Sequence, residues 1–430
     1  MFKTLRNAWS IPELRKKMLF TIFMLIVYRF GCVIPVPGLD ATMMQAFMGA
    51  DGGMGLFSLL DTFSGGALSN ATIFAMGITP YINSSIIIQL LTVAIPALER
   101  LSKQGEEGRK KINSVTRYAT IILALLQATG LYFTLKAYNV VADPNVMSFI
   151  TIVATFTAGT AFIMWIGEEI TDKGIGNGIS LIIFAGIISR IPTAIITLYN
   201  KFVVGATPLS IILLIVVLLV FIAVLGFVVF MNNAERRIPI QYAKRVVGRK
   251  MYGGQSTNIP IKVAMAGVMP IIFASSICSF PATIIQFMGG VNNASPFWKA
   301  VYEQITTTGW IYAVIYFVLI IFFTYFYTAM QYNPVEMANN IKQNGGFIPG
   351  LRPGKSTSEY IAKTLNRVVL VGALFLGLIA VLPICLSHIS MLSGIAMGGT
   401  SLLIVEGVAL ETVKQIESQM LMRHYKGFLE

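Results

Sequence analysis

The sequence MGITPYI at residues 76–82 returns in altered form as AGVMPII at residues 266–272. Both stretches follow the pattern glycine, aliphatic residue, any residue, proline, any residue, isoleucine, and paired serines come shortly after each. Proline removes a backbone donor and glycine permits close approach, so both stretches interrupt apolar helices. In lipid such interruptions survive only where the backbone is buried in protein or faces a water-filled cavity. The two stretches therefore predict the helices at the functional centre.

The composition is that of a membrane protein. Of the 430 residues, 55% are hydrophobic and 12% are charged, which leaves too little polar surface to cover a soluble globule of this size. A helix needs about 20 apolar residues to cross a bilayer core. We predict ten spans, at residues 18–36, 70–95, 118–138, 147–166, 179–199, 208–231, 263–288, 310–330, 368–386 and 391–408.

Lysine and arginine are distributed unevenly between the gaps that separate these spans. Twenty-seven of the 32 lie in the two tails and in every second gap. Because Lys and Arg hold their loops in the cytoplasm, this alternation predicts that both tails are cytoplasmic. No small-residue cleavage site follows the first apolar stretch, so we expect that stretch to be retained as a span.

A second repeat supports the first. The sequence NGISLII at residues 177–183 corresponds to GGTSLLI at residues 398–404, so spans two and five match spans seven and ten. The first group of five spans starts in the cytoplasm and the second group starts outside. Matching spans therefore cross the membrane in opposite directions, as in the inverted repeats of many transport proteins. We predict an all-α polytopic fold with two pseudo-symmetric five-helix halves, residues 1–200 and 201–430, around a central pore.

The repeats place the same bulky, inert side chain at equivalent positions of the two halves. Ile82 corresponds to Ile272, and Ile183 corresponds to Ile404. Ordinary helix packing would account for any one of them. Four that correspond across the pseudo-two-fold axis predict a hydrophobic constriction, which can shut a pore by dewetting.

A short apolar segment precedes the second span. Residues 55–66 read GLFSLLDTFSGG, which is too short to cross a bilayer and ends in glycines. We interpret it as a re-entrant segment on the outer side that folds into the pore as a movable stopper. Its apolar residues are Leu56, Phe57, Leu59, Leu60 and Phe63.

Two long cytoplasmic gaps, residues 232–262 and 331–367, carry more basic residues than topology requires. Such clusters attract acidic or RNA-rich surfaces, so we predict that the two gaps form a docking surface.

The main alternative is an ion-coupled secondary transporter, which shares inverted repeats and broken helices but needs ionisable groups inside the membrane. Arg29 and Glu406 are the main candidates for such groups, and Arg29 has the further options of pairing with a carbonyl or snorkelling. An intramembrane hydrolase is disfavoured, because the sequence has no HExxH or GxSxG motif. The sequence around residue 354 resembles a phosphate-binding loop, but Pro349 replaces its first glycine. We predict no enzyme activity, catalytic residue, cofactor or metal.

Several motifs together resemble the SecY family of protein-translocation channel subunits, and the resemblance covers nearly the whole chain. They are FSGGAL at 63–68, GITPYI at 77–82, SIIIQLL at 85–91, GIGNGIS at 174–180, YAKR at 242–245, PGLRPG at 349–354 and GGTSLLI at 398–404. The resemblance implies an hourglass pore closed by an aliphatic ring, with residues 55–66 as the plug and Asn177 beside the ring at the start of a pore helix. The ring residues it implies are Ile78, Ile82, Ile179, Ile183, Ile272 and Ile404.

The resemblance also implies a function and partners. The chain would pass unfolded preproteins across the bacterial cytoplasmic membrane, and would release signal sequences and membrane helices into lipid through a lateral gate formed by spans two and three against seven and eight. It would assemble with the small subunits SecE and SecG. The ribosome or the SecA motor ATPase would dock on the basic gaps, at Lys244, Arg245, Arg249, Lys250 and Arg352.

Overall fold

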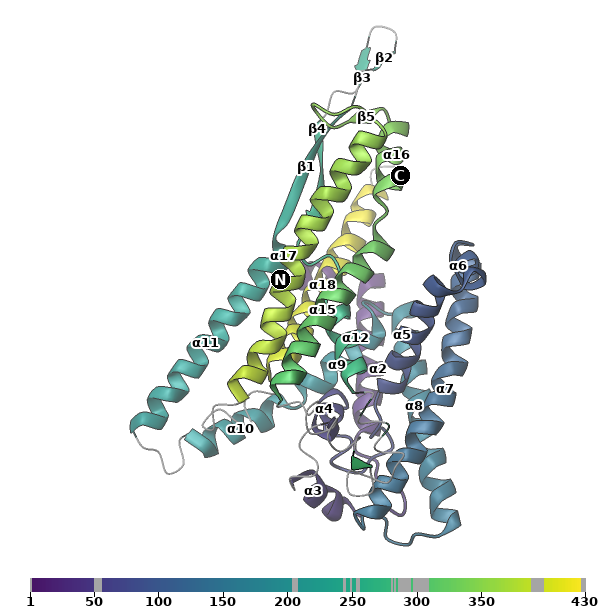
Figure 1. Cartoon of the computed structure of the whole chain (residues 1–430), viewed down its shortest axis with the longest axis vertical. Helices are drawn as coiled ribbons and strands as arrows, with labels where there is room; N and C mark the ends of the chain where they lie inside the picture. Colours follow the sequence, from purple (N-terminus) through teal and green to yellow (C-terminus); the bar gives the residue numbers. More distant parts are fainter. Residues whose placement is uncertain are drawn as a thin grey trace.

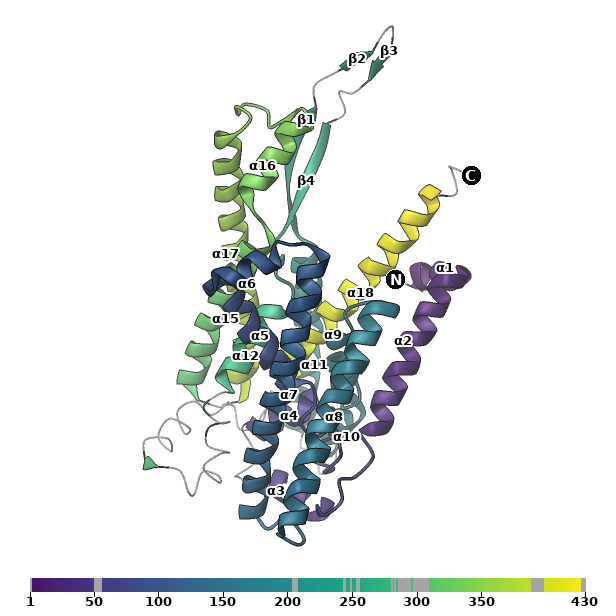
Figure 2. The ribbon, with the colours of Figure 1, turned by 90° about the vertical axis from the view of Figure 1, so that its right-hand side faces the viewer.

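The chain is mostly helical in a computed structural model (Figure 1). The structure describes residues 2–49, 56–202, 208–242, 245–247, 250–252, 256–279, 309–387 and 398–426, together with 281, 284, 295 and 296. Long helices form a bundle, and a narrow β-structure rises from one end of it (Figure 1). We call this the sheet end of the bundle. Helix α1 and the C-terminal part of helix α18 lie toward it (Figure 2).

The helices of the first part of the chain alternate between long apolar rods and short connecting pieces. They are α1 (Phe2–Ser10), α2 (Pro12–Gly31), α3 (Ala41–Gly49), α4 (Leu56–Phe63), α5 (Thr79–Ala94), α6 (Pro96–Ser102), α7 (Glu106–Ala137), α8 (Val146–Lys173), α9 (Gly178–Ile188) and α10 (Ile191–Phe202).

The second part of the chain combines helices with strands. Its helices are α11 (Pro208–Asn233), α12 (Met269–Cys278), α15 (Trp310–Gln331), α16 (Pro334–Gln343), α17 (Lys355–Ser387) and α18 (Gly398–Lys426). Its strands are β1 (Glu235–Tyr242), β2 (Arg245–Val247), β3 (Lys250–Tyr252), β4 (Ser256–Lys262) and β5 (Gly346–Phe347).

A helix occupies part of each of the ten predicted spans. Among the described residues, six helices are long and apolar enough to cross a membrane, and the pair α5 and α6, bent by 105°, makes a seventh if it is counted as one span. Helix α12 is apolar but short, and the last predicted span extends over residues 391–397, which lie outside the described part. The chain is a multi-pass helical membrane protein.

The two MGITPYI-type stretches adopt the same backbone geometry. Gly77 and Gly267 have φ angles of +57° and +59°, which suit glycine because it has no Cβ. Helices α5 and α12 then start two residues later, each with a proline in its first turn. The predicted spans 70–95 and 263–288 are therefore wrong in their first parts, where turns replace helix. Proline fits the first turn of a helix, so it marks the start of these helices and does not kink them.

The β-structure was missed by the sequence reasoning. Strand β1 pairs with β4 from Glu235 to Gln241 and with β5 at Gln241 and Tyr242, in antiparallel order β4-β1-β5, and β2 pairs with β3. The signal was a period of two, because Ile238 and Ile240 are buried while the residues between and before them are exposed. These isoleucines pack with Ile261 against α16 and α17.

Candidate functional site

The six isoleucines of the predicted ring belong to, or pack against, one large hydrophobic cluster with residues from both parts of the chain. Five of them are buried, and Ile179 is partly buried against the same cluster. They come from the N-terminal parts of four helices, at or within seven residues of the start of each. Their positions are Ile78 and Ile82 at α5, Ile179 and Ile183 in α9, Ile272 in α12 and Ile404 in α18.

Asn177 fixes the start of helix α9. Its side-chain oxygen accepts hydrogen bonds from the backbone N–H groups of Ile179, at 3.1 Å, and Ser180, at 3.3 Å. Such N-caps satisfy donors that lack a partner within the helix. A Cβ on Gly178 would lie 2.0 Å from the backbone oxygen of Gly167, so the start of α9 lies directly against α8. Asn177 therefore positions the part of α9 that carries two ring isoleucines.

The predicted stopper is a separate helix of eight residues, α4, which contains Leu56, Leu59 and Leu60. It contacts α9 (Figure 1). Phe57 is buried in a second hydrophobic cluster, where its ring meets that of Phe47 edge to face at 5.2 Å. Phe63, at the other end of α4, packs against the cluster that holds the isoleucines. The segment thus bridges the two apolar clusters.

Polar groups from two neighbouring helices bind the backbone just after α4. The Tyr28 hydroxyl donates to the Ser64 carbonyl at 3.3 Å, and the Arg29 guanidinium donates to the Gly65 carbonyl at 3.3 Å. Both donors belong to the last turns of α2. On the other side, the Ser189 hydroxyl lies 3.4 Å from the same Gly65 carbonyl. Of the two options left open for Arg29, the structure has the bond to a carbonyl.

An ion pair between a buried carboxylate and a partly exposed arginine lies beside these bonds, and the sequence reasoning did not find it. Asp61, in α4, is 2% exposed and pairs with Arg190, which follows α9. Its second carboxylate oxygen accepts a hydrogen bond from the Ser69 N–H at 2.9 Å. The sequence signal was an acidic residue inside an otherwise apolar segment, because a buried carboxylate requires a partner.

Glu406 is also buried, two residues beyond Ile404 in α18. One of its carboxylate oxygens accepts a hydrogen bond from the Asn232 side chain at 2.8 Å, whereas the other has no partner among the described residues. Asn232 lies in the last turn of α11, so this bond joins α11 to α18.

The predicted docking residues lie at the sheet end. Arg245 and Lys250 belong to the paired strands β2 and β3, which project beyond the bundle (Figure 1). Arg352 is exposed in the loop before α17. Lys244 and Arg249 lie outside the described residues.

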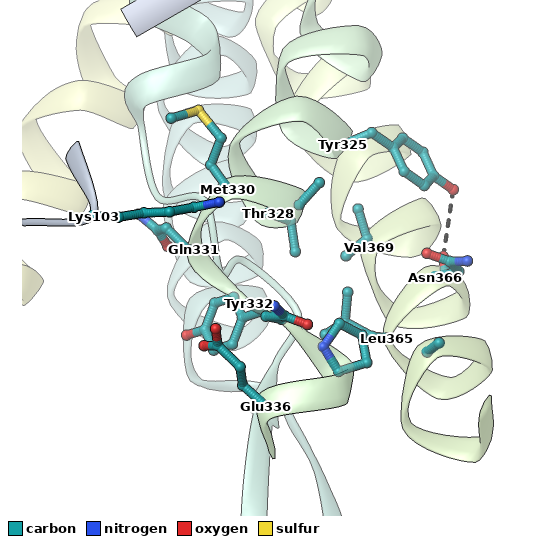
Figure 3. A pocket seen from close by; sticks show the side chains of 14 residues that line it. Lys103, Tyr325, Thr328, Met330, Gln331, Tyr332, Glu336, Leu365, Asn366 and Val369 are labelled. Carbon is teal, nitrogen blue, oxygen red and sulfur yellow. Dashed lines mark hydrogen bonds between the residues drawn. The ribbon is translucent and has the colours of Figure 1, made fainter. Parts of the chain in front are cut away.

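A cavity of about 420 Å³ also lies toward the sheet end, between α15, α16 and α17 on one side and Lys103 on the other (Figure 3). Lys103 follows α6, so residues from both the first and the second part of the chain line the cavity. The Lys103 ammonium donates to Glu99 at 2.6 Å, and this bond lowers the pKa of Glu99 and raises the pKa of Lys103. Both groups are therefore charged at neutral pH.

Comparisons with known proteins identify the family to which the chain belongs. The SecY family model matches residues 72–413. The protein translocase subunit SecY of Streptomyces galbus is 47% identical over 443 aligned residues, which cover 100% of both chains. The protein of the same name from Halalkalibacterium halodurans is 45% identical over 437 residues, again over 100% of both chains.

Solved structures share the fold. One is a structure of SecY, solved to show that its plug domain stabilises the closed state of the translocation channel. It matches with a TM-score of 0.65 and 18% identity, covering 94% of this chain and 92% of that one. Sec61 in a canine ribosome-channel complex from the endoplasmic reticulum matches with a TM-score of 0.55 and 16% identity, over the same shares. On the family match and the full-length relatives, the chain belongs to the SecY family of protein translocase subunits.

Proposed function

We propose that the chain forms a channel through which unfolded preproteins cross the bacterial cytoplasmic membrane, with both tails in the cytoplasm. The observation that carries this proposal is that the six isoleucines, from helices of both halves, share one apolar cluster, with Ile179 packed against it. The two halves are residues 1–200 and 201–430. The relatives named above are translocase subunits, so they lend no support to the ion-coupled transporter alternative.

An aliphatic ring suits a passenger of varied sequence. A polar or charged lining would bind some side chains and delay them, whereas isoleucine side chains close around any chain without offering hydrogen bonds. In the resting state the same side chains exclude water, and with it ions. The plug, residues 55–66, completes the seal from the side on which α4 lies.

The lateral gate is proposed at the contact between α5 and α12, flanked by α7 and α15. Helices α5 and α12 contact each other directly, and each belongs to a different half. Both begin just after a glycine-containing turn, so the two gate helices start in the same way in the two halves. Separation at this contact gives signal sequences and membrane helices a path from the pore to lipid.

Docking is proposed at the sheet end. The solved Sec61 structure that shares this fold is part of a ribosome-channel complex. Arg245, Lys250 and Arg352 place basic residues on the projecting part of the chain, where the ribosome or the motor ATPase SecA would bind, and Lys244 and Arg249 belong to the same gap in the sequence. SecE and SecG are proposed as the small partner subunits within the membrane.

The experiment that tests the proposal replaces the ring. The variant carries Ile82→Ser, Ile183→Ser, Ile272→Ser and Ile404→Ser, and its resting conductance is measured in planar bilayers with the purified complex. We expect a higher conductance than in the parent protein, because small polar side chains lower the barrier to wetting. The matched control carries Ile212→Ser and Ile215→Ser in α11, where both side chains are more than half exposed.

Preprotein transport into vesicles completes the test. The parent complex should move a preprotein across the membrane when a motor and ATP are supplied. Equal conductance in the ring and control variants would contradict the position of the pore. Substrate-driven ion flux without preprotein transport would instead support the transporter.

A further inference from the structure

We propose that Asp61 and Arg190, together with Arg29, form a polar latch that holds the plug segment closed against the first half of the channel. The proposal rests on the function proposed above, because it assumes that residues 55–66 are a plug. It assigns to three charged residues inside an apolar protein a role that neither the repeats nor the isoleucine ring requires.

The ion pair is the centre of the latch. Asp61 is 2% exposed, and its two carboxylate oxygens are divided between the Arg190 guanidinium and the Ser69 N–H. Arg190 is less enclosed, with 36% of its side chain exposed. A buried charge that loses its partner is strongly destabilised, whereas a half-exposed charge is solvated by water. The two members of the pair are therefore not equivalent.

The backbone beside the ion pair is held from two sides. The Asp61 carbonyl accepts a hydrogen bond from the Gly66 N–H at 2.9 Å, which closes the turn after α4. Gly65 has a φ angle of +67°, and its carbonyl accepts a hydrogen bond from the Arg29 guanidinium of α2. A Cβ on Gly65 would lie 2.8 Å from the Gly186 Cα, so α9 touches the turn directly.

These bonds are made by Tyr28 and Arg29 of α2 and by Ser189 and Arg190, which follow α9. All of them belong to the first half of the chain. Separation of α5 from α12 therefore does not by itself break the latch, and the plug stays with the first half when the gate opens. Displacing the plug requires a second event, in which Asp61 leaves Arg190.

Because Asp61 is buried and Arg190 is partly exposed, substitutions at the two positions should have unequal effects on resting conductance. A merely structural role does not predict this difference. In Arg190→Gln, a buried carboxylate loses its cation, so the closed plug is destabilised and resting conductance rises, by roughly tenfold or more. In Asp61→Asn, the side-chain oxygen still accepts from Ser69 and Arg190 is solvated, so the rise is smaller. In the double variant no buried charge remains, and its conductance falls below that of Arg190→Gln alone.

The matched control is an ion pair in the same half that does not touch the plug. Arg117 and Glu168 join α7 and α8 with an N–O distance of 2.8 Å, and the Glu168→Gln variant should keep the parent conductance. Transport of a passenger with a weakened signal sequence serves as the second readout. We expect Arg190→Gln to raise this transport, because less work is needed to displace the plug, and Glu168→Gln to leave it unchanged.

The measurements also separate this proposal from the function on which it rests. The reference is a variant that lacks residues 56–63, which leaks if the segment is a plug. If that deletion leaks while Asp61→Asn and Arg190→Gln match the parent, the latch is refuted and the plug remains. A double variant that leaks more than Arg190→Gln also refutes the latch. If the deletion does not leak, the plug assignment itself fails. If Arg190→Gln does not accumulate, Asp61→Asn and the double variant, compared with Glu168→Gln, still decide the matter.

Discussion

At the scale of single residues, Gly186 of α9 lies directly against the backbone of the turn after α4. A Cβ on Gly186 would lie 2.6 Å from the Phe63 carbonyl oxygen and 3.3 Å from the Gly65 nitrogen. Both atoms belong to the backbone, which cannot shift as easily as the end of a flexible side chain can. The space taken by one methyl group therefore decides whether the turn after α4 can lie against α9.

We predict that Gly186→Ala displaces the plug turn and raises resting conductance. Overpacking of this kind costs about 1–3 kcal/mol, which corresponds to roughly a tenfold change in the balance between seated and displaced plug. Bilayer conductance measures it. The control is Gly226→Ala in α11, where a Cβ meets nothing within 4 Å and alanine favours the helix. Parent conductance in Gly186→Ala would show that the turn has room to move.

The sequence marks residues that repeat but not residues that pair across the fold. Two copies of one pattern mark Ile82, Ile183, Ile272 and Ile404, and these four belong to one large cluster. That they form a constriction stays a prediction. Asp61 and Arg190 stand 129 positions apart and belong to no repeat. Their pairing depends on how α4 folds back beside α9, and no local pattern encodes that geometry.

At the scale of elements, the β-structure changes how the basic gap presents its charges. The gap was predicted as a loop, yet β1 and β4 pair residue by residue from Glu235 with Lys262 to Gln241 with Ser256. A paired ribbon holds its end far from the bundle, whereas a loose loop of the same length collapses onto the surface. The proposed docking residues Arg245 and Lys250, near the end of the ribbon, therefore lie away from the bundle.

We predict that Arg245→Glu combined with Arg352→Glu lowers the affinity for SecA or for the ribosome and impairs export, with normal abundance of the protein. Reversing charges on such a surface acts mainly on the association rate and makes binding less sensitive to salt. Binding at two salt concentrations measures it. Lys136→Glu, an exposed change in the last turn of α7 at the opposite end of the bundle, should bind normally. Unchanged affinity in the double variant would move the docking site elsewhere.

At the scale of the whole molecule, the two ends of the chain meet. Helix α1 contacts α18, and a small cluster joins Ala8, Leu14 and Ile175 of the first half to Ile416 of the second. A Cβ on Gly176 would lie 3.3 Å from the Thr412 hydroxyl oxygen, which brings the loop before α9 against the same helix. The two halves are therefore held together by these contacts of α18 as well as by the contact at the proposed gate.

We predict that Ile416→Ala lowers the thermal midpoint of the purified protein. Ile416 is 3% exposed, and truncation of a buried isoleucine costs about 2–5 kcal/mol. Thermal unfolding in detergent measures the loss. Leu421→Ala, in the same helix but at a side chain that is 70% exposed, should change stability by about 0.5 kcal/mol or less. Equal midpoints for the two variants would mean that the contact between α1 and α18 contributes little.

The base of the β-ribbon gives the molecule a mechanical connection. Only residues 263–268 separate β4 from α12, and the Val263 N–H donates to the Ala234 carbonyl at 2.9 Å, which ties the two strands at their root. The Val263 carbonyl oxygen occupies the space that a side chain on Gly372 would need, so the root of the ribbon packs directly against α17. A ribbon of paired strands resists bending more than a single chain does. The ribbon is therefore a stiff element that connects to α12 through residues 263–268.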